Sequence, residues 1–102
     1  MEGYRITPKA LAELLQLVEY VARESGPDRA AVFLDDILDA ADELGKHPGI
    51  GHLRTDLTDE PLRFWPVHGC LLIYRPGTRP IELVHVVSGA RDIESLLGRK
   101  PC

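Results

Sequence analysis

The second half of the chain contains three short apolar runs, each bounded by glycine or proline. They cover residues 62–67, 70–75 and 81–87, with His68-Gly69 in the first gap and the segment 76–80 in the second. Short apolar runs separated by turn residues are typical of β-strands joined by hairpins. Because hairpins place neighbouring strands antiparallel, the pattern predicts a small antiparallel β-meander.

The first half shows the three- and four-residue apolar spacing of two amphipathic helices. Thr7 and Pro8 suit the N-cap and first position of a helix that ends near Gly26, and a second helix is predicted from Pro27 to Gly45. The short turn between them makes the helices antiparallel neighbours. The apolar positions of the first helix are Leu11, Leu14, Leu15, Val18, Val21 and Ala22.

The two halves need each other, because a small sheet with one apolar face is not stable alone in water. The predicted class is α+β with two layers, an N-terminal helical hairpin packed on a small antiparallel β-sheet. A β-like segment at Tyr4-Arg5-Ile6 precedes the helices, and Asp92 is placed to cap a short C-terminal helix over 93–97. We expect one domain over residues 1–98 and a loose tail over 99–102.

Charge is distributed unevenly along the chain. Residues 1–48 carry five bases against ten acids, whereas 49–102 carry seven bases against six, and the net charge is −4. A protein that grips nucleic-acid phosphates usually shows a basic surplus. Direct nucleic-acid binding is therefore not expected.

Two further features concern the compartment. No apolar run reaches the roughly 20 residues that span a bilayer, and the N-terminus lacks the layout of a signal peptide. We expect a cytoplasmic protein that makes no membrane contact. Cys70 lies in a predicted strand and Cys102 is the last residue, so a buried, reduced Cys70 is expected rather than a disulfide.

The residue types that carry chemistry form no recognisable catalytic or metal motif, so no catalytic residue, metal or cofactor is predicted. His47 and His52 lie five apart across a glycine loop, which does not suit zinc. The acidic run over 35–43 reads as a solvated helix face. His85 is either a partly buried structural histidine, which we favour, or a general base, and no carboxylate is obviously dedicated to orienting it.

Other residues also allow two interpretations. Trp65 either covers the core, which we favour, or stacks on a base. Gly49 and Gly51 form a tight turn rather than a phosphate cradle, because no strand precedes them. The arginines of the second half either share one electropositive surface, suited to acidic peptide or RNA, or are scattered solvated charges. Those of the predicted sheet and its flanking loops are Arg54, Arg63, Arg75, Arg79 and Arg91.

An ordered set of short motifs resembles the ParE branch of the RelE/ParE toxin superfamily across nearly the whole chain. Each motif is weak alone, and their order is fairly specific. They are Thr7-Pro8-Lys9-Ala10, His47-Pro48-Gly49-Ile50-Gly51, Arg54-Thr55-Asp56-Leu57, Leu62-Arg63, Gly69 to Arg75, and Gly89-Ala90-Arg91-Asp92.

The resemblance implies the toxin half of a bacterial type II toxin–antitoxin pair. A ParD-like antitoxin encoded beside it would neutralise the toxin, a heterotetramer of two toxins and two antitoxins would be one assembly, and DNA gyrase would be the target. We expect an antitoxin tail to lie along the helical hairpin and across the sheet arginines. The residues expected to bind target or antitoxin are Arg54, Arg63, Arg75, Arg79, Arg91 and Asp92.

The ribonuclease branch of the same superfamily cuts messenger RNA on the ribosome, and this chain departs from its pattern. Phe64 and Leu62 stand where that branch places sheet lysines, Leu71 where it places an arginine, and Leu97 where it places a tyrosine. Only Arg91 matches, and one cation cannot supply acid, base and phosphate stabilisation together. Ribosome-dependent cleavage and a non-toxic antitoxin-binding remnant remain the alternatives.

Overall fold

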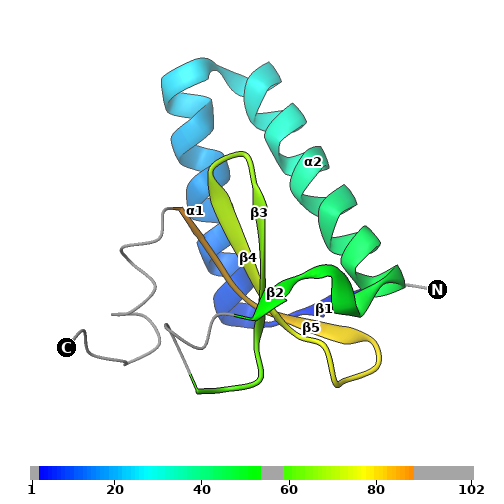
Figure 1. Cartoon of the computed structure of the whole chain (residues 1–102). Coiled ribbons are helices and arrows are strands. Elements are labelled where there is room, and N and C mark those ends of the chain that lie inside the picture. The colour runs from blue at the N-terminus through cyan, green and yellow to red at the C-terminus, as the bar shows by residue number, and fades with distance from the viewer. Residues whose placement is uncertain (1–2, 54–58, 89–102) are drawn as a thin grey trace.

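The computed structural model describes residues 3–53 and 59–88, which form two helices and a five-stranded sheet. Both helices lie on one face of the sheet (Figure 1). The elements in chain order are β1 Tyr4–Ile6, α1 Pro8–Ser25, α2 Pro27–Lys46, the 3₁₀ turn η1 Pro48–Ile50, β2 His52–Leu53, β3 Arg63–Val67, β4 Cys70–Arg75 and β5 Ile81–Ser88.

The helices begin and end at capping, proline and glycine residues. The Thr7 hydroxyl accepts a hydrogen bond from the Ala10 N–H at 3.1 Å, and Pro8 occupies the first turn. Gly26, with a φ of 95°, ends α1 in a conformation that side chains rarely adopt, and Pro27 begins α2 at once. The predicted helical hairpin is confirmed, with α2 ending at Lys46 rather than Gly45.

The predicted α+β class, a helical hairpin packed on a sheet, is confirmed. The sheet is mixed, however, and not wholly antiparallel as predicted. The meander of β3, β4 and β5 is confirmed, but the strand order is β1-β5-β4-β3-β2 and β1 pairs with β5 in parallel. The helical hairpin carries the chain from one sheet edge to the other, so β1 meets the last described strand. Hairpin signals report only neighbours in sequence and cannot reveal this pairing.

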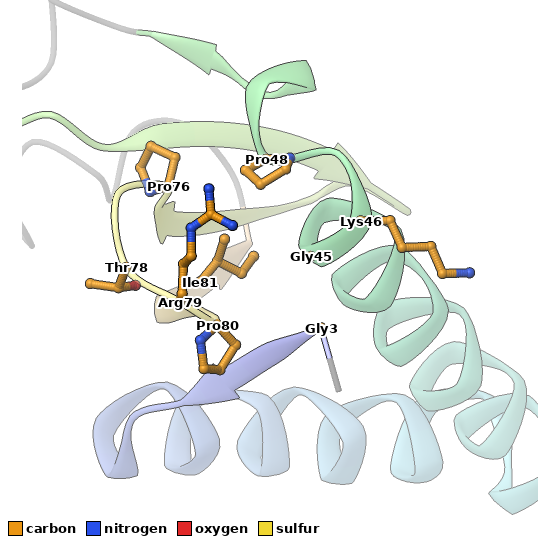
Figure 2. A pocket seen from close by; sticks show the side chains of 9 residues that line it. All are labelled: Gly3, Gly45, Lys46, Pro48, Pro76, Thr78, Arg79, Pro80 and Ile81. Atoms are coloured by element: carbon orange, nitrogen blue, oxygen red, sulfur yellow. The ribbon is translucent and has the colours of Figure 1, made fainter. Parts of the chain in front are cut away.

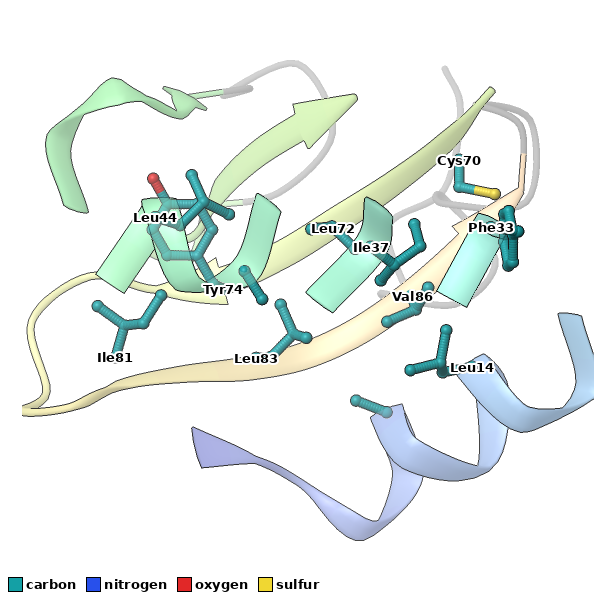
Figure 3. Packing of buried hydrophobic residues seen from close by; sticks show 12 residues of the cluster. Leu14, Phe33, Ile37, Leu44, Cys70, Leu72, Tyr74, Ile81, Leu83 and Val86 are labelled. Atoms are coloured by element: carbon teal, nitrogen blue, oxygen red, sulfur yellow. The ribbon is translucent and has the colours of Figure 1, made fainter. Parts of the chain in front are cut away.

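The main core lies between the helices and the sheet (Figure 3). Phe33, Ile37 and Leu44 of α2 and Leu14 of α1 pack against side chains of β4 and β5. A register shift beside Tyr74 lets Leu83 and Val86, three residues apart on β5, join this same cluster. Fully burying one such side chain contributes about 1.5–3 kcal/mol, so this layer dominates the stability of the fold.

The opposite face of the sheet is also apolar. Phe64 and Ile73 are cross-strand partners that are only 1% and 0% exposed, and they form a second cluster with Leu62 and Val87. Because strand residues alternate between faces, this cluster lies on the other side from Leu72 and Tyr74. The predicted C-terminal helix, the tail and the end of the predicted domain all fall outside the described residues.

Candidate functional site

The segment from His47 to Gly51 is fastened to the sheet by two side chains. The buried Tyr74 hydroxyl donates to the Pro48 carbonyl at 2.6 Å and accepts the Gly51 N–H at 3.0 Å. The Arg63 guanidinium donates to the Gly51 carbonyl at 2.7 Å and to the Gly49 carbonyl at 3.3 Å. Gly49 and Gly51 therefore lie in the turn predicted for them. Hydrogen bonds from this turn to Arg63 and Tyr74 hold the end of α2 against β3 and β4.

Burial is the main influence on the pKa of Tyr74. Desolvation raises the pKa of Tyr74 from its usual 10.0, while the Gly51 N–H and the charge of Arg63 oppose part of that rise. Gly51 has to be glycine, because a Cβ there would overlap the Tyr74 ring and hydroxyl. The motif from His47 to Gly51 therefore has a structural role in this protein, which is to form the turn that Tyr74 and Arg63 hold.

The described arginines differ in what they contact. Arg63 is committed to the turn just described. Arg75 lies 3.6 Å from both Glu60 and Glu82, so its charge is already paired. Arg63 is the cross-strand partner of Tyr74, and Arg75 follows Tyr74, so the two arginines project from opposite faces. One surface containing both is therefore not formed.

Arg79 is exposed and has neither an ion pair nor a hydrogen bond with any residue the structure describes. It lies on the connection between β4 and β5, at the edge of an open hollow of about 390 Å³ (Figure 2). The remaining candidates, Arg54, Arg91 and Asp92, fall outside the described residues. A binding role for all six stays a prediction.

The outer face of α1 carries more apolar surface than the core uses. Leu11 and Leu15, both in the predicted apolar set, are 43% and 54% exposed, whereas Leu14 is buried. Residues four apart on a helix lie one above the other, so the two leucines form one exposed patch. A contiguous exposed apolar patch is a candidate docking surface for another protein.

His85 has a carboxylate partner, contrary to the sequence interpretation. Its Nδ1 lies 3.3 Å from Glu13 Oε2, and Glu13 Oε1 accepts the Val86 N–H at 2.9 Å. The paired part of β1 ends at Ile6 opposite Leu83, so Glu13 takes the place of a strand carbonyl on the β5 edge beyond it. This arrangement fits the structural interpretation of His85. The sequence gives no local signal for it, since the partners lie on separate elements.

The other residues with two interpretations are also placed. Trp65 packs against the main core while its ring stacks on His52, with centroids 5.9 Å apart. Cys70 is buried, and that burial raises the pKa of its thiol. Within residues 3–53 and 59–88, no three side chains of His, Cys, Asp or Glu gather as metal ligands. No described helix is long and apolar enough to cross a membrane.

These features define a small α+β protein with a helical hairpin on a mixed sheet. Its exposed leucines on α1, and Arg79 with no ion pair to a described residue, suit contact with another polypeptide. Residues 4–93 match the family model of the ParE toxin of the type II toxin–antitoxin system parDE, and the chain belongs to that family. No curated protein is similar enough in sequence to be counted as a relative.

A solved structure shares the fold. It is described as the chromosomal ParDE toxin–antitoxin system from P. aeruginosa, and its matching chain has a TM-score of 0.72 and 19% sequence identity to this one. The match covers 88% of this chain and 98% of the other. The shared fold is the helical hairpin on its sheet.

Proposed function

We propose that this ParE toxin is neutralised by a ParD-like antitoxin and acts on DNA gyrase in the cytoplasm. The family membership supports the toxin role, and the likeness to a structure described as a ParDE system supports the antitoxin class. A heterotetramer of two toxins and two antitoxins is the assembly that we propose.

The observation that carries the choice of target is the chemistry of the sheet face away from the helices. Phe64 and Leu62, at positions where the ribonuclease branch places lysines, are only 1% and 2% exposed. A buried hydrophobic side chain can neither bind a scissile phosphate nor transfer a proton. This face is unsuited to cutting RNA, which favours a toxin that acts by binding a protein.

The exposed leucines of α1 supply the proposed antitoxin-docking surface. An amphipathic helix or tail that covers Leu11 and Leu15 would bury apolar area that this chain leaves in water. The acidic residues between the apolar positions of the helices would then face basic residues at the rim of the partner.

The test compares the two toxin mechanisms directly. Purified toxin is added to gyrase in a supercoiling assay that also scores cleaved DNA, and messenger RNA integrity is followed in cells after induction without antitoxin. We expect gyrase inhibition, intact messages, and reversal by the antitoxin encoded beside the toxin. Cut messages with unaffected gyrase would assign the ribonuclease mechanism, and no effect in either assay would contradict the gyrase target.

A further inference from the structure

The hollow beside Arg79 is bounded by three separate parts of the chain. Gly3 at the entry to β1, Gly45 and Lys46 at the end of α2, and the β4–β5 connection line it. The Arg79 guanidinium extends toward the side where Pro48 and Pro76 lie (Figure 2). The space is therefore shaped by elements that the fold holds in place.

The charged side chains that line this hollow, Arg79 and Lys46, are both positive. None of the described residues that line it is acidic, although the chain as a whole carries a net charge of −4. Lys46 also borders it, but its ammonium points away in Figure 2 and lies 4.0 Å from Asp42. Arg79 is the lining cation that has no acidic partner among the described residues.

The walls are preorganised. Pro48, Pro76 and Pro80 have fixed φ angles and no N–H groups, so they add rigid apolar surface and no competing donor. The Thr78 hydroxyl donates to the Arg75 carbonyl at 3.4 Å, which ties down the same connection. A ligand group entering the hollow therefore meets a guanidinium fork whose surroundings need little ordering.

We propose that this hollow is a carboxylate-binding subsite that receives an Asp or Glu side chain of the antitoxin. The subsite rests on the proposed function, because it assigns the occupant to the antitoxin. A guanidinium binds one carboxylate through two parallel hydrogen bonds, which matches one arginine that has no acidic partner among the described residues. Nucleic acid is disfavoured, because affinity for phosphates grows with the number of neutralising cations and this hollow offers one.

The antitoxin is favoured over another protein by position. Gly45 and Lys46 are the last residues of α2, so the hollow continues from the end of the helical hairpin. A polypeptide that follows the hairpin to the C-terminal end of α2 therefore reaches residues that line the hollow. The hollow would then fix the register of that polypeptide by one charged contact.

The test measures the affinity of full-length toxin variants for the antitoxin encoded beside the toxin, by calorimetric titration at low and high salt. We expect Arg79→Ala to weaken binding about tenfold, with a smaller loss at high salt. Arg79→Lys should recover only part of the affinity, because an ammonium lacks the planar fork. The matched control is Arg5→Ala on β1, an exposed arginine with no ion pair to a described residue.

A charge exchange identifies the occupant. If an Asp or Glu of the antitoxin enters the hollow, changing it to Arg should weaken binding to the wild-type toxin and restore binding to Arg79→Glu. Unchanged affinity of Arg79→Ala would overturn the subsite and leave the antitoxin pairing intact. Lost gyrase inhibition with unchanged antitoxin affinity would assign the hollow to the target instead, and a wild-type toxin that does not bind the antitoxin would overturn the pairing as well.

Discussion

Among single residues, Tyr74 has the clearest structural role. Its hydroxyl bonds the Pro48 carbonyl and the Gly51 N–H. We predict that Tyr74→Phe lowers the free energy of unfolding by about 1–3 kcal/mol, because the buried Gly51 N–H loses its acceptor. Urea unfolding measures this change. Tyr20→Phe is the control, since Tyr20 is 55% exposed and should change stability by less than about 0.5 kcal/mol. Equal stability of both variants would show that the hydroxyl does not hold the turn.

Burial of Tyr74 and Cys70 also links stability to alkaline pH. It raises both pKa values, from 10.0 for the phenol and 9.0 for the thiol, so the folded state keeps protons that the unfolded chain has released. This stabilisation is fully present below the unfolded pKa values and is lost as pH rises through the folded ones. We therefore predict that the free energy of unfolding falls as pH rises above about 9.

Urea unfolding over a series of alkaline pH values tests this slope. Cys70→Ala should remove the part of the fall that begins near the thiol pKa, and Tyr74→Phe the part that begins near the phenol pKa. A slope that neither substitution changes would place the responsible groups elsewhere.

At the scale of elements, the end of α2 meets the start of β1 at two glycines. A Cβ on Gly45 would come closer to the Gly3 backbone than real atoms approach, and backbone cannot move aside as a side chain can. We predict that Gly45→Ala destabilises the protein by about 1–3 kcal/mol, because overpacking outweighs the roughly 1 kcal/mol that alanine gains in a helix.

Gly49→Ala is the matched control for this contact. A Cβ at Gly49 meets nothing within 4 Å, and its φ lies outside the range that side chains avoid. Thermal unfolding of both variants measures the difference. A Gly45→Ala variant as stable as wild type would mean that α2 and β1 can separate without cost.

Between elements, sequence reasoning succeeds where the signal is local and fails where it is distant. Thr7, Pro8 and Gly26 fix the helix ends through groups within a few residues, so those ends are predictable. The parallel pairing of β1 with β5 and the bond from Val86 to Glu13 join segments far apart in the chain. The sequence predicts Arg63 as a binding residue, because nothing in it shows that the Arg63 guanidinium holds the turn near Gly51.

Over the molecule as a whole, the groups that stabilise the fold are separate from those that remain available for binding. The sheet has apolar clusters on both faces, and two of its described arginines, Arg63 and Arg75, are already engaged. The outer face of α1 and the Arg79 hollow are two described regions that retain unused binding chemistry. A partner that covers both would bury apolar area and pair a charge that meets no acidic group within residues 3–53 and 59–88, without disturbing the core.

The exposed leucines make the helical part of this interface testable. We predict that Leu11→Ala with Leu15→Ala weakens antitoxin binding by about ten- to a hundredfold, because each side chain loses apolar area that the complex would bury. Stability should fall by about 1–3 kcal/mol in total, since each side chain is roughly half buried.

Tyr20→Ala is the control for this double substitution. Its exposed fraction of 55% matches the 54% of Leu15, but five residues turn it about 140° around the helix. Calorimetric titration should therefore separate the two sides of α1. If Tyr20→Ala weakens binding more than the double leucine variant, the antitoxin lies on the side of α1 that borders the β5 edge, where Tyr20, Gln16 and Glu13 line an open groove.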